Sequence, residues 1–418
     1  MDQPVGVPAG DYLLTVAGVV APTDVLGRVA QLLGGTGSVD RVADFQARSN
    51  PQTITAQVRV GAPSDVFTIV DPGSVVTWSG VTLAPTTWGY VVRGQAVTSA
   101  ASPKVIWHGV NGNPGMASAD YGILHASFPK DTIVRTFVDE ECWDPFFTAA
   151  QAQKGCSSSS YRSSILAAVQ ATISNGMVAL IAVTRAGRDN PSYIPGAQKD
   201  EMGPDQHTLS VWRDLSATFA NNPQVVFETF NETKWHRYVN YPPANIGGGT
   251  LWSQGGSVTV DGMTWTTPGV QQIVDTIRAA SADNVVMVEG TEWGDDLIPV
   301  ETMPVLGTNL VYSFHAYNEG ATIYPPVLDS QIAPLLDPAG SFRYAGYLSE
   351  FGTTQQDVYG NLDYGSQYLR SVINWAYAHG VGWTVWGWFP TWYAHFGMLV
   401  TYEPLRLTSR AQTVVYRF

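Results

Sequence analysis

Two glutamates stand near the ends of apolar runs that carry further polar residues. Glu232 closes the run VVFETFNE directly after Asn231, and Glu350 lies in the run YAGYLSEFG. A carboxylate at the end of a buried strand is costly to leave unpaired, so such positions are often functional. Two facing carboxyl groups can divide one reaction between a general acid/base and a nucleophile. These glutamates are therefore the first candidates for catalytic residues.

Short apolar runs from residue 104 onward predict the strands that would position these carboxylates. Continuous apolar runs are typical of parallel strands buried on both faces. Eight such runs alternate with longer segments, several of which have helical periodicity, and this favours a (β/α)₈ barrel with loop insertions. A doubly wound open sheet is the alternative, but it usually has fewer strands and a glycine-rich phosphate loop, and no such motif follows any run. The runs are 104–111, 132–138, 177–183, 225–232, 284–290, 310–317, 344–352 and 382–389, and the helical segments are 161–176, 209–222, 268–284 and 364–380.

The carboxyl ends of barrel strands open onto one face, where active sites form. Glu232 ends the fourth run and Glu350 lies near the end of the seventh, so the two would face each other across the barrel mouth. Glycoside hydrolysis needs such a pair, and a separation of about 5 Å corresponds to retention of configuration. The polar or aromatic residues at the predicted strand ends are Asn111, Arg135, Arg185, Asn231, Glu232, Glu289, Glu292, His315, Tyr317, Glu350, Trp386 and Trp388.

The neighbours of the two glutamates suggest different roles. Asn231 can hold a sugar hydroxyl beside the scissile bond, so Glu232 is the better candidate for the acid/base. Arg135 on the second strand would keep Glu350 ionised as the nucleophile. Tyr317 could donate a hydrogen bond to that nucleophile. Trp386 is expected to form the apolar floor under the sugar at the cleavage site.

The remaining candidates have competing structural interpretations. Asn111 is a candidate substrate contact. Trp235 and Trp293 follow strands whose loops line the cleft, so each of these tryptophans either contacts substrate or packs in the barrel. His315 lies in the cleft or in the core. Glu289 and Glu292 are expected to belong to loop structure. Arg135 could instead pair with Asp139 or Glu140. No cluster of Asp, Glu and His has metal-ligand spacing, so no metal and no cofactor is predicted.

The ordered motifs resemble glycoside hydrolase family 5, the large cellulase family of clan A. VVFETFNE is similar to its strand-four Asn-Glu signature, SFHAY to its strand-six His-x-Tyr, SEFG to its strand-seven nucleophile and VWGW to its strand-eight Trp. The resemblance covers about residues 104–418. It implies a (β/α)₈ barrel in which Glu232 is the acid/base and Glu350 the nucleophile. It further implies that Arg135 supports the nucleophile and that Asn231, His315, Tyr317 and Trp386 surround the substrate.

Two positions depart from the family pattern. Thr233 stands where the family usually has Pro after the acid/base, and Arg185 ends strand three where a His is usual. Both changes affect loops at the cleft rather than the catalytic pair. They weaken any substrate preference taken from the family. Among the substrates that the family implies, a β-1,4-glucan leads, followed by mannan, xylan-like and mixed-linkage glucans.

Residues 1–103 differ in composition from the rest of the chain. They contain no Glu, Lys, His or Cys, which predicts a small accessory domain at 1–103, a linker at 99–104 and a catalytic domain at 104–418. Within the first part, 11–20 reads as a strand and 24–35 as a helix, followed by short strands. The accessory domain is therefore expected to be α+β or β-rich, and it offers few acid-base groups for catalysis.

Composition limits the partners and the location. With 22 basic and 35 acidic residues the net charge is −13, which disfavours nucleic acids and anionic membrane surfaces. The first residues lack the features of a signal peptide, and no apolar run reaches the roughly 20 residues of a membrane span. Cys142 and Cys156 either form a disulfide or are unrelated thiols.

The combined expectation is a retaining hydrolase of β-linked polysaccharide, extracellular or virion-associated, with an endo-β-1,4-glucanase-like activity. The alternative is a glycan-binding or phage-tail structural protein that uses the same barrel without hydrolysis. In that case residues 1–103 would dock it to an assembly partner.

Overall fold

A computed structural model describes most of the chain between residues 102 and 389, together with strand segments on either side. The gaps between 102 and 389 are 113–115, 117, 129–131, 185–202, 221, 234–246, 261–262, 281, 318–324, 338–339, 341–342 and 354–361. Two candidates from the sequence, Arg185 and Trp235, lie outside the described residues.

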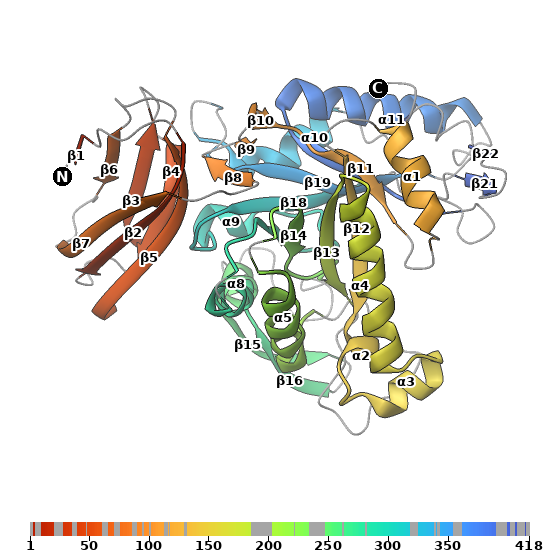
Figure 1. Ribbon diagram of the computed structural model, residues 1–418, viewed down its shortest axis with the longest axis horizontal. Helices are drawn as coiled ribbons and strands as arrows, with labels where there is room; N and C mark the ends of the chain where they lie inside the picture. Colours follow the sequence, from red (N-terminus) through yellow and green to blue (C-terminus); the bar gives the residue numbers. More distant parts are fainter. Residues whose placement is uncertain are drawn as a thin grey trace.

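Eight parallel strands form a closed barrel, which confirms the predicted (β/α)₈ fold and excludes the open sheet (Figure 1). Each strand pairs with the next in sequence order, and the first pairs with the last to close the ring. All eight predicted runs contribute one strand each. The strands are β11 (His108–Asn111), β12 (Thr132–Asp139), β13 (Val178–Thr184), β14 (Val225–Glu228), β17 (Val286–Glu289), β18 (Leu310–Tyr317), β19 (Gly346–Gly352) and β20 (Gly382–Val385).

Helices follow most of the barrel strands and cover the outside of the ring. The four helices predicted from periodicity are present as α4, α5, α8 and α11, and their buried faces pack on outward-facing strand residues in one large core. The helices are α1 (Ser118–Ser127), α2 (Glu140–Trp143), α3 (Thr148–Lys154), α4 (Ser158–Ser174), α5 (Gln206–Phe219), α7 (Gly247–Gln254), α8 (Val270–Ala279), α9 (Pro299–Thr302), α10 (Pro325–Ile332), the 3₁₀ turn η1 (Ala333–Leu335) and α11 (Leu362–His379).

Side chains alternate between the outside and the inside of the barrel along each strand. On β17, Val286 and Val288 belong to the outer core, whereas Met287 belongs to a separate core inside the ring. The same alternation directs Glu289 to the interior. A register shift between Phe314 and His315 where β18 meets β19 pairs His315 with Glu350. Strand alternation and this shift together bring polar side chains to the inside near the carboxyl ends.

A three-stranded antiparallel sheet, β8 (Tyr90–Arg93), β9 (Ala96–Ser99) and β10 (Ser102–Val105), closes the other end of the barrel. Val97 and Val105 share the inner core with barrel residues such as Met287. The backbone N–H of Val92 donates to Asn309 Oδ1 at 3.0 Å, just before β18. The segment predicted as a linker, 99–104, instead contains the end of β9 and most of β10, which pairs antiparallel with β9 and packs on the barrel.

The described segments of the first 85 residues are strands of two sheets, so the described portion of this part is β-rich. The predicted helix at 24–35 is wrong: Arg28–Gly35 is strand β3, which pairs antiparallel with β4 and β6, and these ladder bonds outweigh the local helical pattern. In Figure 1 these strands lie beyond β8, at the left of the barrel. The strands are β1 (Gln3–Pro4), β2 (Gly10–Val20), β3, β4 (Asp40–Gln46), β5 (Arg48–Val60), β6 (Val66–Val70) and β7 (Val76–Pro85).

Two small hairpins complete the described elements. The first, β15 (Gly255–Val260) and β16 (Met263–Pro268), lies between α7 and α8 in the long connection after β14. The second, β21 (Leu399–Thr401) and β22 (Arg406–Leu407), follows the last barrel strand.

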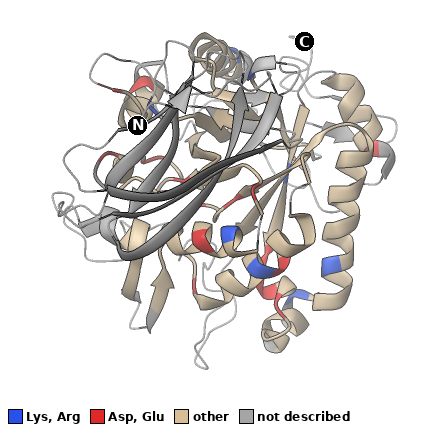
Figure 2. Ribbon diagram, turned by 60° about the vertical axis from the view of Figure 1, so that its left-hand side comes forward, with Lys and Arg blue, Asp and Glu red and all other residues tan. Residues whose placement is uncertain are grey.

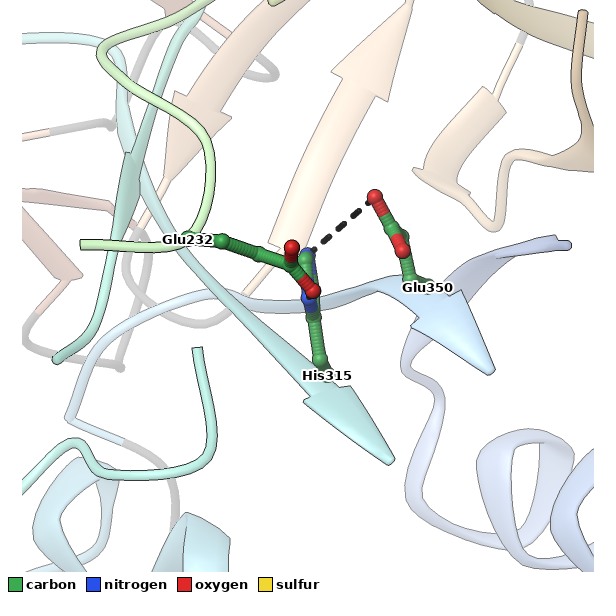
Figure 3. Close-up of side chains that lie close together, drawn as sticks. All are labelled: Glu232, His315 and Glu350. Carbon is green, nitrogen blue, oxygen red and sulfur yellow. Dashed lines mark hydrogen bonds and ion pairs between the residues drawn. The ribbon is translucent and has the colours of Figure 1, made fainter. Parts of the chain in front are cut away.

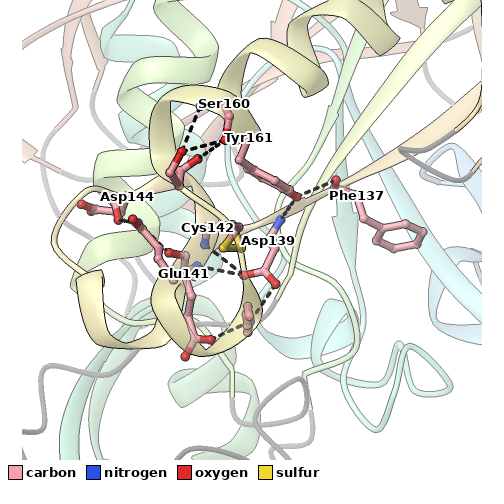
Figure 4. The surroundings of a disulfide bond; sticks show 11 residues. Phe137, Asp139, Glu141, Cys142, Asp144, Ser160 and Tyr161 are labelled. Atoms are coloured by element: carbon pink, nitrogen blue, oxygen red, sulfur yellow. Dashed lines mark hydrogen bonds and ion pairs between the residues drawn. A yellow bond between two sulfur atoms is a disulfide. The ribbon is translucent and has the colours of Figure 1, made fainter.

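A disulfide joins Cys142 in α2 to Cys156, just after α3 (Figure 4). Asp139 caps α2 by accepting hydrogen bonds from the backbone N–H groups of Glu141 and Cys142, and Lys154 bridges Asp139 and Glu141. The two cysteines are thus partners, and the bond ties together the loop that follows β12.

Charged residues are sparse over the described part of the molecule, and Figure 2 shows blue and red positions separated by long tan stretches. Such a distribution offers no basic stripe along the helices and strands that Figure 2 colours by charge, in line with the low charge content of 14%. Among the described helices, none combines the length and the apolarity needed to cross a membrane.

Candidate active site

Glu232, His315 and Glu350 meet at the carboxyl ends of the barrel strands (Figure 3). One polar atom from each lies within 4.8 Å of the others, although the three residues follow or belong to β14, β18 and β19. The side chain of Glu232 is 27% exposed, whereas that of Glu350 is 4% exposed. The two predicted catalytic carboxyl groups are therefore close together, and Glu232 is the more accessible to solvent.

Arg135 lies at the centre of this group with its guanidinium fully buried. It donates to Glu228 and Glu350, and its Nη2 lies 3.4 Å from Glu289 Oε2. Its Cζ sits 4.5 Å from the ring centroid of Phe137, two residues along the same strand face. The alternative partners expected from the sequence bind elsewhere: Asp139 pairs with Lys154, and Glu140 accepts a hydrogen bond from the hydroxyl of Thr208. Arg135 thus binds the interior carboxylates and not the acidic residues that follow its own strand.

Two asparagines align the guanidinium. Asn231 Oδ1 accepts from Arg135 Nη2 at 2.7 Å, and Asn111 Oδ1 accepts from Nη1 at 3.1 Å. The amide of Asn111 donates in turn to the carbonyl of Ser349 at 3.1 Å, beside Glu350. Asn111 is completely buried. Its observed contacts are with the protein frame, and it links the first strand to the seventh and to Arg135.

His315 contacts both candidate catalytic glutamates, since its Nε2 lies 3.8 Å from Glu350 Oε1, and Tyr317 contacts Glu350 (Figure 3). Tyr317 donates its hydroxyl to Glu350 Oε2 at 2.6 Å, as the sequence suggested. The Nδ1 atom of His315 lies 3.3 Å from Glu232 Oε1. His315 packs against Gly294, where an added Cβ would lie 2.8 Å from the imidazole Cγ, so only glycine fits at this position. The histidine belongs to the site, and not to the apolar core.

Two of the tryptophans predicted to contact substrate, Trp386 and Trp293, lie within the described residues. Trp386 is partly exposed at the end of β20, and its ring meets that of Phe137 edge to face at 5.6 Å. This places Trp386 one side chain away from Arg135. Trp293 is partly exposed in the loop after β17, directly before Gly294.

Two buried glutamates in the site were not recognised from the sequence. Glu228 accepts from Arg135 Nε and, at 2.7 Å, from the hydroxyl of Ser313. Glu289, which was expected to be loop structure, is only 2% exposed and contacts Arg135, His315 and the backbone N–H of Glu232. Counting two residues on from Val226 and from Met287 along their strands gives both positions, so strand alternation was a usable signal.

The neighbouring carboxylates outweigh the effect of burial on the pKa of His315 and of Arg135. Burial alone would lower the pKa of His315, but Glu350 and Glu289 raise it well above 6.5, so the imidazole is cationic at neutral pH. Burial alone would likewise lower the pKa of Arg135, and Glu228, Glu350 and Glu289 raise it overall. Both groups therefore carry a charge that the interior carboxylates balance.

Burial acts in the opposite direction on the acidic groups. It raises the pKa of Glu232 above 4.5; the hydrogen bond from His315 offsets part of this, and the charge of Glu350 adds to it. It raises the pKa of Glu289 to about 7, with His315 and Arg135 opposing and Glu228 adding to the rise. Burial and Glu350 also raise the pKa of Tyr317 well above 10, so it remains a hydroxyl donor. Glu232 is thus kept protonated to higher pH than an ordinary glutamate.

Glu232, His315 and Glu350 also have the spacing of a metal site. Two features oppose a metal there. Arg135 already pairs with Glu350, and a cationic imidazole would have to lose its proton before it could bind a metal. The arrangement suits proton transfer and attack by a carboxylate better than metal binding.

A closed (β/α)₈ barrel with two facing glutamates at its strand ends is the arrangement of a glycoside hydrolase. Residues 132–391 match the model of the cellulase family, glycosyl hydrolase family 5. The chain belongs to this family and is an O-glycosyl hydrolase. A search of curated proteins found no match to the chain.

Solved structures of similar fold include three glucan-degrading enzymes. A β-glucanase from Saccharophagus degradans aligns with a TM-score of 0.58 and 17% identity over 79% of this chain and 93% of its own. The catalytic domain of endoglucanase Cel5A from Thermobifida fusca aligns at 0.54 and 13% over 78% and 96%. An endocellulase from Pyrococcus horikoshii aligns at 0.55 and 17% over 80% and 99%. At these identities the similarity concerns the barrel fold.

Proposed function

We propose that this hydrolase cleaves within β-linked glucan chains with retention of configuration, in an endo-β-1,4-glucanase-like reaction. The observation that carries the proposal is the distance between the two carboxyl groups, whose oxygens lie within 4.8 Å. A retaining pair stands about 5 Å apart, whereas an inverting pair needs roughly 6.5–9.5 Å to admit a water molecule. Glu232 is the acid/base and Glu350 the nucleophile.

In the first step Glu350 attacks the anomeric carbon while Glu232 protonates the glycosidic oxygen, so that the bond to the leaving sugar breaks. Arg135 and Tyr317 hold the two oxygens of Glu350, which directs the carboxylate at the sugar. The raised pKa of Glu232 keeps its proton available for transfer. Asn231 and Trp386 are positioned to contact the sugar beside the scissile bond.

In the second step Glu232 removes a proton from water, which attacks the anomeric carbon and frees Glu350. The charge of Glu350 contributes to the raised pKa of Glu232, and that charge is absent while Glu350 is bonded to the sugar. The pKa of Glu232 therefore falls in the intermediate, and the same carboxyl changes from acid to base. The nearby His315 cation stabilises the resulting carboxylate.

The substrate class is supported by the names of structural neighbours, among them a β-glucanase in complex with cellotetraose and an endoglucanase in complex with cellotetraose. The net charge of −13 opposes binding of uronic-acid polymers, which favours a neutral polymer as the substrate.

The proposal is tested by measuring release of reducing ends from carboxymethylcellulose, mixed-linkage β-glucan, mannan and xylan, and by following the first product by proton NMR. We expect activity on a β-glucan, a rapid fall in viscosity and a β-configured first product. A folded protein that cleaves none of these polymers, or that forms the α-anomer first, would contradict it.

A further inference from the structure

Glu289 is a buried carboxylate that has no part in the mechanism above. It ends β17 and is 2% exposed. A carboxylate held away from water must recover its lost hydration through hydrogen bonds or opposite charges. The contacts of the Glu289 carboxylate therefore indicate what this residue does in the site.

Each oxygen of Glu289 contacts a different part of the site. Oε1 accepts a hydrogen bond from the backbone N–H of Glu232. Oε2 lies 3.3 Å from His315 Nε2 and 3.4 Å from Arg135 Nη2. One carboxylate thus connects the end of β14 with β18 and β12. The Nε1 atom of Trp252 donates to the backbone carbonyl of Glu289 at 3.0 Å, which fixes the strand end itself.

The first contact bears on the backbone of the acid/base. Glu232 has φ of 55°, in the left-handed region that residues with a Cβ adopt at a cost. Its N–H points into the protein, where Glu289 is its acceptor. Loss of that acceptor would leave both the strained backbone and an unsatisfied N–H, and the two would favour a different path for the chain after β14.

The second contact bears on the side chain of the acid/base. His315 faces Glu232 through Nδ1 and Glu289 through Nε2. A carboxylate at Nε2 orients the ring and favours a proton on both nitrogens, so that Nδ1–H can donate to Glu232. Glu289 therefore reaches Glu232 by two routes, through its amide and through the histidine.

We propose that Glu289 is a positioning residue that fixes the acid/base carboxyl of Glu232 by holding its backbone amide and, through His315, its side chain. This inference rests on the acid/base role proposed for Glu232. Glu350 is held by hydrogen bonds from Arg135 and Tyr317, and its Oε1 also lies 3.8 Å from His315 Nε2, so Glu289 reaches the nucleophile only through Arg135 and His315.

The charges around Glu289 agree with this role. The groups that face it are Arg135 from β12, Glu228 from β14, Glu232 after β14 and His315 from β18. Burial raises the pKa of Glu289 to about 7, and His315 and Arg135 oppose the rise. Glu289 in turn raises the pKa of His315.

The test compares two substrates that differ in their need for an acid. Cello-oligosaccharides require protonation of the leaving oxygen, whereas 2,4-dinitrophenyl β-cellobioside carries a leaving group that departs without it. For Glu289→Gln we expect kcat/KM on cello-oligosaccharides to fall about 100-fold, as for a displaced catalytic group. On the aryl substrate we expect a loss of less than about tenfold, because protonation contributes little there.

Glu301→Gln is the matched control, since Glu301 is an exposed residue of α9, and it should leave both values unchanged. A second readout is the pKa of His315, followed by NMR of labelled histidine rings, which should fall in Glu289→Gln and stay the same in the control. If Glu289→Gln does not fold, Glu289→Asp, which keeps the charge but withdraws the carboxylate, is compared on the same two substrates.

Equal losses on both substrates, or an unchanged His315 pKa, would overturn the positioning role. An inactive wild-type protein would instead contradict the proposed function, so the two failures are distinguishable.

Discussion

The guanidinium of Arg135 lies among three glutamates, and its charge allows them to share the interior of the barrel. Glu228, Glu289 and Glu350 come from three different strands and all contact it. Removal of one partner from a buried ionic group leaves an uncompensated buried charge. This costs more free energy than burial of the complete group. Arg135 is therefore expected to matter for stability as well as for the orientation of Glu350.

Replacement of Arg135 by Met should lower the free energy of unfolding by about 3–5 kcal/mol at pH 8. The loss should be smaller at pH 5, because the freed carboxylates bind protons more readily in the folded than in the unfolded chain, so the variant gains stability as the pH falls. Urea unfolding of the wild type and the variant at both pH values measures the difference. An equal loss at the two pH values would show that the carboxylates are not what Arg135 balances.

The activity should depend on pH through Glu232, which must be protonated in the free enzyme. Burial and the charge of Glu350 raise its pKa above 4.5, so the alkaline limb of the kcat/KM profile should lie above pH 4.5. Activity is present below this limb and is lost as the pH rises through it. Initial rates on cello-oligosaccharides from pH 3 to about 9 give the profile, and a limb at or below 4.5 would be inconsistent with the environment of Glu232.

Residues with a sequence motif could be predicted at the site, and residues without one could not. Asn231, His315, Tyr317 and Glu350 lie in short patterns whose order along the chain is informative, and they meet at one end of the barrel. Glu289 has no such pattern. Its place follows only from strand alternation and from the neighbours that other strands bring to it, which is information about pairing and not about local sequence.

Among the elements, the loop after β12 is the one that a covalent bond secures. The Cys142–Cys156 bond closes a segment with a sequence separation of 14 that contains α2 and α3. Both helices are short, and isolated helices of this length are marginal. The bond therefore compensates for weak local structure near the rim of the barrel.

Replacement of both Cys142 and Cys156 by Ser should lower the free energy of unfolding by about 3 kcal/mol, as expected for a loop of this size. The catalytic residues lie on other strands or deeper in β12, so kcat at 25 °C should change little. Calorimetry with and without a reductant compares the wild type with the double variant. If reductant lowers the melting temperature of the double variant as much as that of the wild type, the disulfide is not responsible.

The barrel strands were the most predictable elements because each is a continuous apolar run that neighbours cover on both faces. The segment 24–35 was not predictable in this way. Its apolar spacing fits a helix, but Arg28–Gly35 pairs with two other strands, and long-range pairing overrides local propensity. Composition likewise placed a boundary at 103, where a hairpin continues across it.

At the scale of the whole molecule, the three-stranded sheet β8–β10 extends the inner core of the barrel beyond its eight strands. Val97 and Val105 complete the inner core, and Asn309 binds the backbone of Val92 while donating to the carbonyl of Asp283 at 2.9 Å. Removal of this sheet would expose the interior of the ring to water at about 1.5–3 kcal/mol for each buried aliphatic side chain. The sheet therefore belongs energetically with the barrel.

Truncation at two positions tests this assignment. A variant that begins at residue 87 keeps β8–β10 and should retain kcat and a cooperative thermal transition close to that of the full chain. A variant that begins at residue 107 lacks the sheet and should melt at a lower temperature or fail to fold. If both variants have the same melting temperature, the sheet does not support the barrel.

The central claim is that Glu350, among four neighbouring glutamates, forms the covalent bond to the sugar. Incubation with 2,4-dinitrophenyl 2-deoxy-2-fluoro-β-cellobioside slows the second step, so the intermediate accumulates and its site can be found by mass spectrometry of peptides. We expect the mass increase of one fluorocellobiosyl group on the peptide that contains Glu350, and none in Glu350→Gln. An active wild-type enzyme that carries the label on Glu228, Glu232 or Glu289, or that carries no label, would contradict the account.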